Sequence, residues 1–183
     1  MSERDRIRWD RRHAQPSLAP ARPTLGWLPP AAPSGALALD LACGQGRHTL
    51  VLLELGYRVV AADVSRRALD HLRSRIGLPD RVLLVQADAD AWPFAGGKFD
   101  LVVVVDFFER NILGALKACL RPGGLLLLDT FLGPASKGGC GPRNPRYRLE
   151  QGELDRTFSN WQVLRRHTFG GEPARDAILA RKP

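Results

Sequence analysis

Short apolar runs alternate with helix-like segments along the chain from residue 35 onward. Five of these runs are rich in aliphatic and β-branched residues and are apolar at successive positions, which is typical of strands that helices cover on both faces. The five runs are Ala36–Asp40, Arg58–Ala62, Val82–Gln86, Leu101–Val105 and Leu125–Asp129. Their alternation with helices predicts βαβ units, and hence an α/β domain around a parallel sheet.

Helices are predicted between these strands, where apolar residues recur at helical spacing. Gly46–Leu55 stops at Gly56, a residue type that adopts the left-handed conformation at helix ends. Ser65 can cap a second helix with an apolar stripe on one side, and Gly77 can end it. A third helix is predicted over Asn111–Leu120, before a Pro-Gly-Gly stop.

Two further strands are predicted toward the end of the chain, Gln162–Thr168 and Ala177–Arg181. Gly170 and Gly171 lie between them and can form the turn of a hairpin. Seven strands are therefore expected in all.

The first 34 residues differ in character from the rest. Residues 3–13 are charged and can form one or two helical turns, whereas residues 16–33 contain six prolines, each of which fixes φ and removes a backbone donor. A chain of 183 residues can bury one core of typical size. We therefore expect residues 1–34 to be a helical segment with a proline-rich linker, and residues 35–183 to form one domain.

Composition narrows the functional classes. The net charge of +8 can favour nucleic-acid binding, but 23 of the 27 basic residues are Arg spread through every segment, which favours compositional bias instead. The apolar stretches are far shorter than the roughly 20 residues of a membrane-spanning helix. The charged first ten residues lack the apolar core of a secretory signal. We expect a soluble, cytoplasmic protein, a monomer or a homodimer, that does not act on nucleic acid.

Three cysteines, Cys43, Cys119 and Cys140, form no CxxC pair and have no metal-ligand spacing. An odd count in a chain without an export signal favours reduced thiols. We expect neither disulfides nor a metal site.

A glycine-containing loop follows the first strand. Asp40 ends that strand, and Gly44 and Gly46 come before a helix, an arrangement in which backbone N–H groups can closely approach a ligand. Asp63 follows Gly44 by 19 residues, at the end of the second strand, where a carboxylate can accept both hydroxyls of a ribose. The combination predicts a cofactor that contains adenosine.

Three details favour S-adenosylmethionine over a dinucleotide. Position 49 is Thr, where a dinucleotide loop needs Gly or Ala for close packing. Asp40 would repel a pyrophosphate but would attract an ammonium and a sulfonium. Asp88, at the end of the third strand, can accept from an adenine amine, with the Ala89 N–H facing a ring nitrogen.

Successive segments resemble the motifs of class I S-adenosylmethionine-dependent methyltransferases, in the right order. They are 39–48 (LDLACGQGRH), 59–65 (VVAADVS), 86–88 (QAD), 99–103 (FDLVV) and 120–124 (LRPGG). The resemblance implies a Rossmann-like sheet of seven strands in the order 3-2-1-4-5-7-6, with strand 7 antiparallel and helices on both faces. Residues 9–13 and 141–147 also resemble small bacterial members of the tellurite-resistance and thiopurine type. One departure is Ala42, where the family usually has Gly.

The cofactor-binding residues expected from this comparison begin with the loop and extend to neighbouring strand ends. His48 is interpreted as a residue that positions the loop and not as a base, and Cys43 as a small residue packed under the cofactor. Arg12 can reach the cofactor carboxylate from the N-terminal segment. The full set is Asp40, Ala42, Cys43, Gly44, Gly46, Arg47, Asp63, Val64, Asp88, Ala89, Asp106 and Arg12.

The acceptor is expected outside the carboxyl ends of the strands. Asp106 is a candidate base or ligand of the cofactor's amino group, and Arg110 a candidate ligand of an anionic acceptor. Residues proposed to contact substrate are Phe107, Asp129, Arg143 and Tyr147, the last two in a cationic loop that could close over the site. For Asp106, Arg110 and Phe107 a purely structural role is an equal alternative, and for the cationic loop a simple solvated loop is the favoured alternative.

Methyl transfer from a sulfonium is an in-line displacement, for which the protein supplies proximity, alignment and a dry pocket. A general base is needed for an alcohol or a protonated amine, but not for a thiolate, a chalcogen oxyanion or an ionised phenol. We expect a small-molecule acceptor, either anionic or a thiol or chalcogen compound.

Three alternatives remain open. An RNA methyltransferase would show salt-sensitive RNA binding. A non-catalytic S-adenosylmethionine-binding protein would bind the cofactor but form no S-adenosylhomocysteine. A nicotinamide-dependent oxidoreductase would bind NAD instead.

Overall fold

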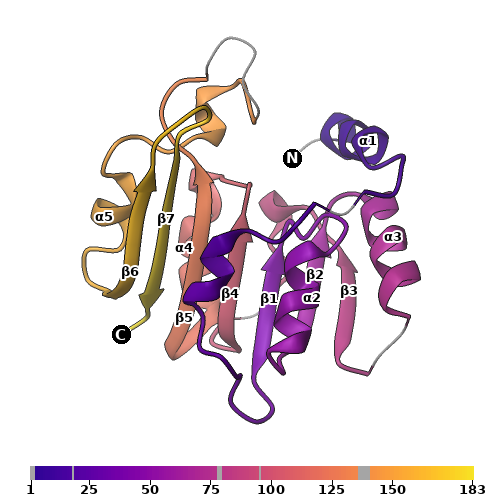
Figure 1. Ribbon diagram of the computed structural model, residues 1–183, viewed down its shortest axis with the longest axis horizontal. Helices are drawn as coiled ribbons and strands as arrows, with labels where there is room; N and C mark the ends of the chain where they lie inside the picture. Colours follow the sequence, from indigo (N-terminus) through magenta and orange to yellow (C-terminus); the bar gives the residue numbers. More distant parts are fainter. Residues whose placement is uncertain (1–2, 18, 78–79, 95, 136–140) are drawn as a thin grey trace.

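The computed structural model describes residues 3–17, 19–77, 80–94, 96–135 and 141–183. Its centre is a seven-stranded sheet in the order β3-β2-β1-β4-β5-β7-β6 (Figure 1). Neighbouring strands pair in parallel from β3 to β5, whereas β7 runs antiparallel to both β5 and β6. This is the predicted strand order, and it confirms the Rossmann-like α/β class. The strands are β1 (Leu37–Leu41), β2 (Arg58–Asp63), β3 (Val82–Gln86), β4 (Phe99–Val105), β5 (Leu120–Phe131), β6 (Gln162–Phe169) and β7 (Arg175–Arg181).

Five α-helices and four short 3₁₀ helices surround the sheet in the described part of the chain. Ser65 caps α3 as predicted, since its side chain accepts a hydrogen bond from the Ala68 backbone N. The α-helices are α1 (Glu3–Arg12), α2 (Arg47–Glu54), α3 (Arg66–Ile76), α4 (Leu113–Cys119) and α5 (Glu153–Thr157). The 3₁₀ helices are η1 (Pro23–Trp27), η2 (Ala89–Ala91), η3 (Arg110–Ile112) and η4 (Pro145–Tyr147).

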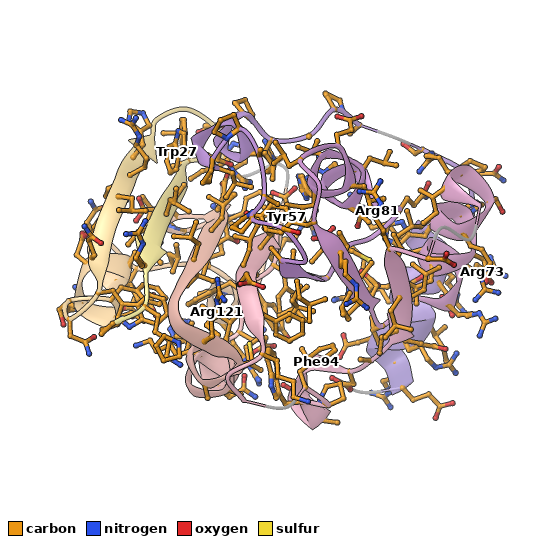
Figure 2. All side chains as sticks on the ribbon, turned by 90° about the horizontal axis from the view of Figure 1, so that it is seen from below. Trp27, Tyr57, Arg73, Arg81, Phe94 and Arg121 are labelled. Atoms are coloured by element: carbon orange, nitrogen blue, oxygen red, sulfur yellow. The ribbon has the colours of Figure 1, made fainter. Side chains whose placement is uncertain are left out.

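The sheet separates two hydrophobic cores. One includes Leu52 of α2, Leu72 of α3 and Tyr57, and the other includes Leu116 of α4 and Phe158. Figure 2 looks along the strands and shows Tyr57 and Phe94 on opposite faces. Burial on both faces explains why β1, β2, β4 and β5 are apolar at successive positions. The expectation is wrong for β3, an edge strand without a fully buried residue, in which Leu83 is exposed.

The structure differs from the predicted boundaries at most elements, and three of the differences bear on the site or the core. β5 begins at Leu120, so the Pro-Gly-Gly segment lies within the strand and does not only end a helix. β7 begins two residues early, at Arg175. The proline-rich segment is not a bare linker, because Leu25 and Leu28 are buried in the core that contains α2 and α3. Apolar packing of these two residues outweighs the irregular backbone that the prolines impose.

In the described residues, no helix has the length and apolar character needed to cross a membrane. Cys43 and Cys119 are buried free thiols, and Cys140 lies outside the described residues.

Candidate active site at the carboxyl edge of the sheet

The glycine-containing loop joins β1 to α2, and Asp63 lies against it. Gly44 and Gly46 have φ of 55° and 84°, conformations that favour glycine. Asp63 Oδ2 accepts a hydrogen bond from the Gly44 backbone N at 2.8 Å, and Oδ1 accepts one from the Ser65 backbone N at 2.8 Å. Burial raises the pKa of the Asp63 carboxyl, while these backbone donors favour its charged form. Gly44 and Asp63, which are 19 residues apart in the sequence, are thus in direct contact.

Two residues of the loop carry its backbone geometry. A Cβ on Gly46 would lie 2.2 Å from Leu72 Cδ1, so the loop packs tightly onto α3. Ala42 has φ of 56°, a left-handed conformation that costs an L-residue roughly 1–2 kcal/mol. Ala42 therefore keeps the backbone shape for which the family usually has glycine.

Asp40 and Cys43 lie beneath the loop. Asp40 is 1% exposed, and its Oδ2 accepts from Thr49 Oγ1 at 2.6 Å. Burial raises the pKa of Asp40 to about 7. Burial, with the nearby Asp40 and Asp63 carboxylates, raises the pKa of Cys43 well above its ordinary value. A thiol in this state stays protonated, which favours a packing role for Cys43 over thiol chemistry.

A pocket of about 270 Å³ opens beside α1 and the carboxyl ends of β2 and β3. Asp88 lies at its rim, and its Oδ1 accepts from the Asp90 backbone N at 2.9 Å, which caps η2. Ala89 follows and is buried. The lining residues are Glu3, Arg6, Val64, Gln86, Ala87 and Asp88.

The N-terminal segment crosses the loop (Figure 1). The Gln45 side chain accepts from the Ser17 backbone N at 2.7 Å and donates to the Gln15 carbonyl at 2.9 Å. The His13 ring lies over Gly44, 3.6 Å from where a Cβ would be. Residues 13–17 therefore form a cover directly above the glycines.

α1 is attached to α3 at the start of that cover. Asp10 Oδ1 accepts from Ser65 Oγ at 2.8 Å and from the Arg67 backbone N at 3.2 Å. Arg12, in the last turn of α1, is exposed.

Three arginines converge on Asp106 at the end of β4, and we call Arg22, Arg47 and Arg175 the arginine cluster. Asp106 Oδ1 lies 3.0 Å from Arg22 Nη2 and 2.6 Å from Arg175 Nη1, and Oδ2 is paired with Arg47. Burial alone would raise the pKa of Asp106, but the three guanidinium groups lower it below its ordinary value. Asp106 has φ of 59°, which Asp tolerates better than most residues.

Asp129, at the end of β5, completes this network. It is 2% exposed, and its Oδ1 accepts from Arg175 Nε at 2.9 Å and Nη2 at 2.6 Å. Its Oδ2 accepts from Thr24 Oγ1 at 2.7 Å. The network therefore joins the proline-rich segment, β4, β5 and β7.

Arg110 is not part of the arginine cluster, because its guanidinium is bound to Glu153. Its Nε and Nη2 each donate to a Glu153 carboxylate oxygen at 2.7 Å, and it also donates to the carbonyls of Arg146 and Arg148 at 2.9 Å. Contacts of this kind hold η3, η4 and α5 together. The geometry supports a positioning role for Arg110 more than direct contact with an acceptor.

The cationic loop is anchored by Arg148, which is buried. Arg148 donates to the carbonyls of Leu132 and Gly133, and its guanidinium lies 5.4 Å from the centre of the Phe131 ring. Arg143 is exposed and Tyr147 is half-buried. Residues 136–140 of the same loop lie outside the described residues.

The aromatic residues near β4 belong to the core that contains α4. Phe108 is buried in it, and Phe107, Trp92 and Phe94 pack against it while partly buried. Phe107 is thus beside the site and also part of the packing.

Sequence reasoning missed Arg22, Thr24 and Arg175. Arg22 and Thr24 lie in a segment that its prolines mark as a linker, and Arg175 comes just before the apolar run of β7. A signal existed for Arg175 alone, since a charged pair, Arg175-Asp176, directly before a buried strand has to be paired.

Known proteins match the region of the chain that contains the glycine loop. Residues 38–124 match a family model described as a methyltransferase domain. The chain is 38% identical over 107 residues to the demethylmenaquinone methyltransferase of Clavibacter sepedonicus, a match that covers 55% of this chain and 43% of that protein. The chain spans about half the length of the curated relatives it matches.

Solved structures share the fold. A S-adenosylmethionine-dependent methyltransferase from Mesorhizobium loti superposes with a TM-score of 0.72 at 18% identity, over 87% of this chain and 96% of that one. TehB from Haemophilus influenzae gives a TM-score of 0.68 at 23% identity, over 82% and 58% of the two chains. With its motifs, strand order and glycine loop, the chain therefore contains a region, residues 38–124, that matches a methyltransferase domain.

Proposed function

We propose that this protein transfers a methyl group from S-adenosylmethionine to a small-molecule acceptor at the carboxyl edge of the sheet. The observation that carries the proposal is the contact between Asp63 and the loop, in which the carboxylate lies 2.8 Å from the Gly44 backbone N. A ribose bound beside these two groups would find an acceptor for its hydroxyls and a tight glycine turn in one place.

The residues present fit the cofactor. The pocket lined by Val64, Ala87 and Asp88 lies next to Asp63, and it offers a carboxylate to an adenine amine. The loop then leads from β1 toward Asp106, whose carboxylate would face the methionine end. When bound, the cofactor would supply a methyl group on a sulfonium; the acceptor would attack the methyl carbon in line, with S-adenosylhomocysteine as the leaving group.

The site supports an acceptor that arrives already nucleophilic. Three arginines hold Asp106 in its ionised form, so it is a weak base. Burial, together with nearby Arg47, lowers the pKa of His48 to about 3, so its imidazole is neutral but a poor proton acceptor. A thiolate, a chalcogen oxyanion, an ionised phenol or a carboxylate needs no base. Positioning and exclusion of water are then the main tasks of the side chains.

Two measurements test the proposal. Calorimetry with S-adenosylmethionine and with NAD should show binding of S-adenosylmethionine alone. Binding of NAD would instead indicate a nicotinamide-dependent oxidoreductase. A coupled assay for S-adenosylhomocysteine, run across thiols, chalcogen oxyanions, phenols and carboxylic acids, should then find turnover. Cofactor binding without turnover on any acceptor would favour a non-catalytic binding protein, and salt-sensitive RNA binding with RNA-dependent turnover would favour an RNA methyltransferase.

A further inference from the structure

The positive charges of the arginine cluster outnumber the negative charges of the carboxylates beside it. Among the described residues, the guanidinium groups of Arg22, Arg47 and Arg175 are paired with two carboxylates, Asp106 and Asp129. His48 lies nearby but is neutral, since its pKa is lowered to about 3 chiefly by burial. Among the cluster and its two carboxylates, the positive charges therefore exceed the negative charges by one.

Donors of the cluster are also left unused. Arg22 Nε and Arg175 Nη1 are buried, with no hydrogen-bond partner among the described residues. Arg175 Nη1 lies 2.6 Å from Asp106 Oδ1 as an ion pair, but without the geometry of a hydrogen bond. A buried donor without a partner is destabilising, and a ligand oxygen that accepted a hydrogen bond from it would remove that penalty.

The cluster has a fixed part and an accessible part. The Arg175 and Asp129 side chains are 8% and 2% exposed, and they hold each other through two hydrogen bonds. The Arg22 and Arg47 side chains are 32% and 23% exposed. The buried pair therefore sets the position of the cluster, while Arg22 and Arg47 can be reached from solvent.

A cavity of about 360 Å³ lies next to the cluster. Thr24 lines it and also donates to Asp129, while Phe169 of β6 pairs in register with Arg175 of β7. In an antiparallel pair, residues directly opposite project from the same face. The rings of Trp27 and Phe169 are stacked with centroids 6.5 Å apart, and both line the cavity.

We propose that the arginine cluster binds an oxyanion, a carboxylate or a phosphate, of the methyl acceptor, and that the cavity beside Trp27 and Phe169 holds its apolar or aromatic body. The inference rests on the proposed function and adds the substrate class. Guanidinium groups match planar and tetrahedral oxyanions through paired N–H donors.

The cofactor's own carboxylate is a less favoured occupant. The groups suited to its ribose and adenine, Asp63 and Asp88, lie at the ends of β2 and β3. The fixed pair of the cluster lies on β5 and β7, on the other side of β1 and β4. The cavity extends the cluster further in that direction, toward β6.

The first test uses benzoate and its neutral isostere benzamide, in calorimetry at constant ionic strength. Benzoate should bind and benzamide should not. Arg22→Gln and Arg47→Gln, which change partly exposed side chains, should each weaken benzoate binding about tenfold, the loss of one charge-assisted contact. Arg121→Gln is the matched control, because Arg121 is 53% exposed, pairs with Asp100 and lies far from the cluster. Equal binding of benzamide, no benzoate binding, or an equal loss in the control would overturn the inference.

A companion measurement concerns the cavity. Trp27→Ala should weaken binding of benzoate but leave binding of acetate or inorganic phosphate unchanged. An equal effect on all three would remove the cavity from the proposal.

The second test uses turnover, with acceptors supplied as pairs of an acid and its amide. The acid should be methylated, and Arg22→Gln should raise its KM about tenfold while the S-adenosylmethionine Kd stays within about twofold. A raised cofactor Kd with an unchanged acceptor KM would assign the cluster to the cofactor and overturn the inference. Failure of the wild type to bind S-adenosylmethionine would instead overturn the proposed function, and the benzoate experiment would still decide the fate of the oxyanion site.

Discussion

The two halves of the carboxyl edge are built in opposite ways. The half over β1, β2 and β3 has carboxylates, Asp40, Asp63 and Asp88, that accept hydrogen bonds from backbone N–H and hydroxyl groups. The half over β4, β5 and β7 has carboxylates that are held by arginines. The first half suits a cationic cofactor with hydroxyl groups, and the second suits an anion. A single sheet edge can thus present both kinds of charge without one cancelling the other.

The largest expected effect on stability comes from Arg175→Met, which removes the buried positive charge from the second half of the edge. Asp129 would be left 2% exposed without its ion-pair partner. Breaking a buried pair typically costs about 3–5 kcal/mol, so the free energy of unfolding in urea should fall by about that amount. The double variant Arg175→Met with Asp129→Leu should recover most of it. A loss below about 1 kcal/mol in the single variant would show that the pair is replaced by solvent.

The next test concerns the first half, where geometry and not charge is decisive. In Gly46→Ala, the new Cβ would overlap Leu72 Cδ1 at a φ of 84°. Overpacking and the left-handed backbone together should lower the free energy of unfolding by about 3 kcal/mol. Gly152→Ala is the control, because Gly152 has a similar left-handed backbone, with φ of 71°, but its Cβ position meets only the end of the flexible Arg156 side chain, at 3.2 Å. Its cost should be only about 1 kcal/mol.

Asp63→Ala separates cofactor binding from binding of an oxyanion. The change removes the carboxylate that contacts Gly44, so S-adenosylmethionine binding measured by calorimetry should weaken by about 2 kcal/mol. Benzoate binding should not change. Asp70→Ala, an exposed residue of α3 paired with Arg66, should leave both affinities as they are. An unaltered cofactor Kd in Asp63→Ala would mean that the ribose site lies elsewhere.

Asp40 predicts a pH dependence of stability. Burial raises its folded pKa to about 7 from 3.8, so between these values the folded state binds more protons than the unfolded state. The free energy of unfolding should therefore fall as pH rises through this window, by about 1.4 kcal/mol per pH unit from this group. Asp40→Asn should remove that slope in denaturation curves at pH 5 and 6. A slope that persists in the variant would assign it to other groups.

The smallest expected effect is a gain. Ala42→Gly relieves a left-handed φ of 56°, so the melting temperature should rise, with a gain of about 1 kcal/mol in the free energy of unfolding. Ala38→Gly in β1 is a suitable control, because that residue lies in a regular strand and should lose stability instead. A loss in Ala42→Gly would mean that the methyl group makes packing contacts worth more than the strain.

The same contrast explains how much of the site was predictable. The first half follows from local order, since Asp40, Gly44, Gly46 and Asp63 lie at the ends of consecutive strands and within one loop. The strand order followed from the family resemblance, and the buried runs marked most of the strands. These features depend on short-range patterns that can be recognised in the sequence alone.

The second half depends on contacts between distant residues. Arg22 is 84 residues from Asp106, and Arg175 is 46 residues from Asp129. No spacing rule links such residues, and the many arginines of the chain make each one unremarkable by itself. Arg110 shows the converse problem, because its position after β4 favoured a role in the site whereas its guanidinium is bound to Glu153.

The position of Arg175 on β7 also affects the order in which the two halves of the site can form. β7 inserts between β5 and β6 and follows both of them along the chain. During synthesis, strands β1 to β4 and the glycine loop can pair before Arg175 has left the ribosome, because they need no residue of β7. Asp106 and Asp129 would then remain charged and would lack their buried partner, Arg175, until the hairpin of β6 and β7 packs against β5. The half of the site that we assign to the acceptor is thus assembled last.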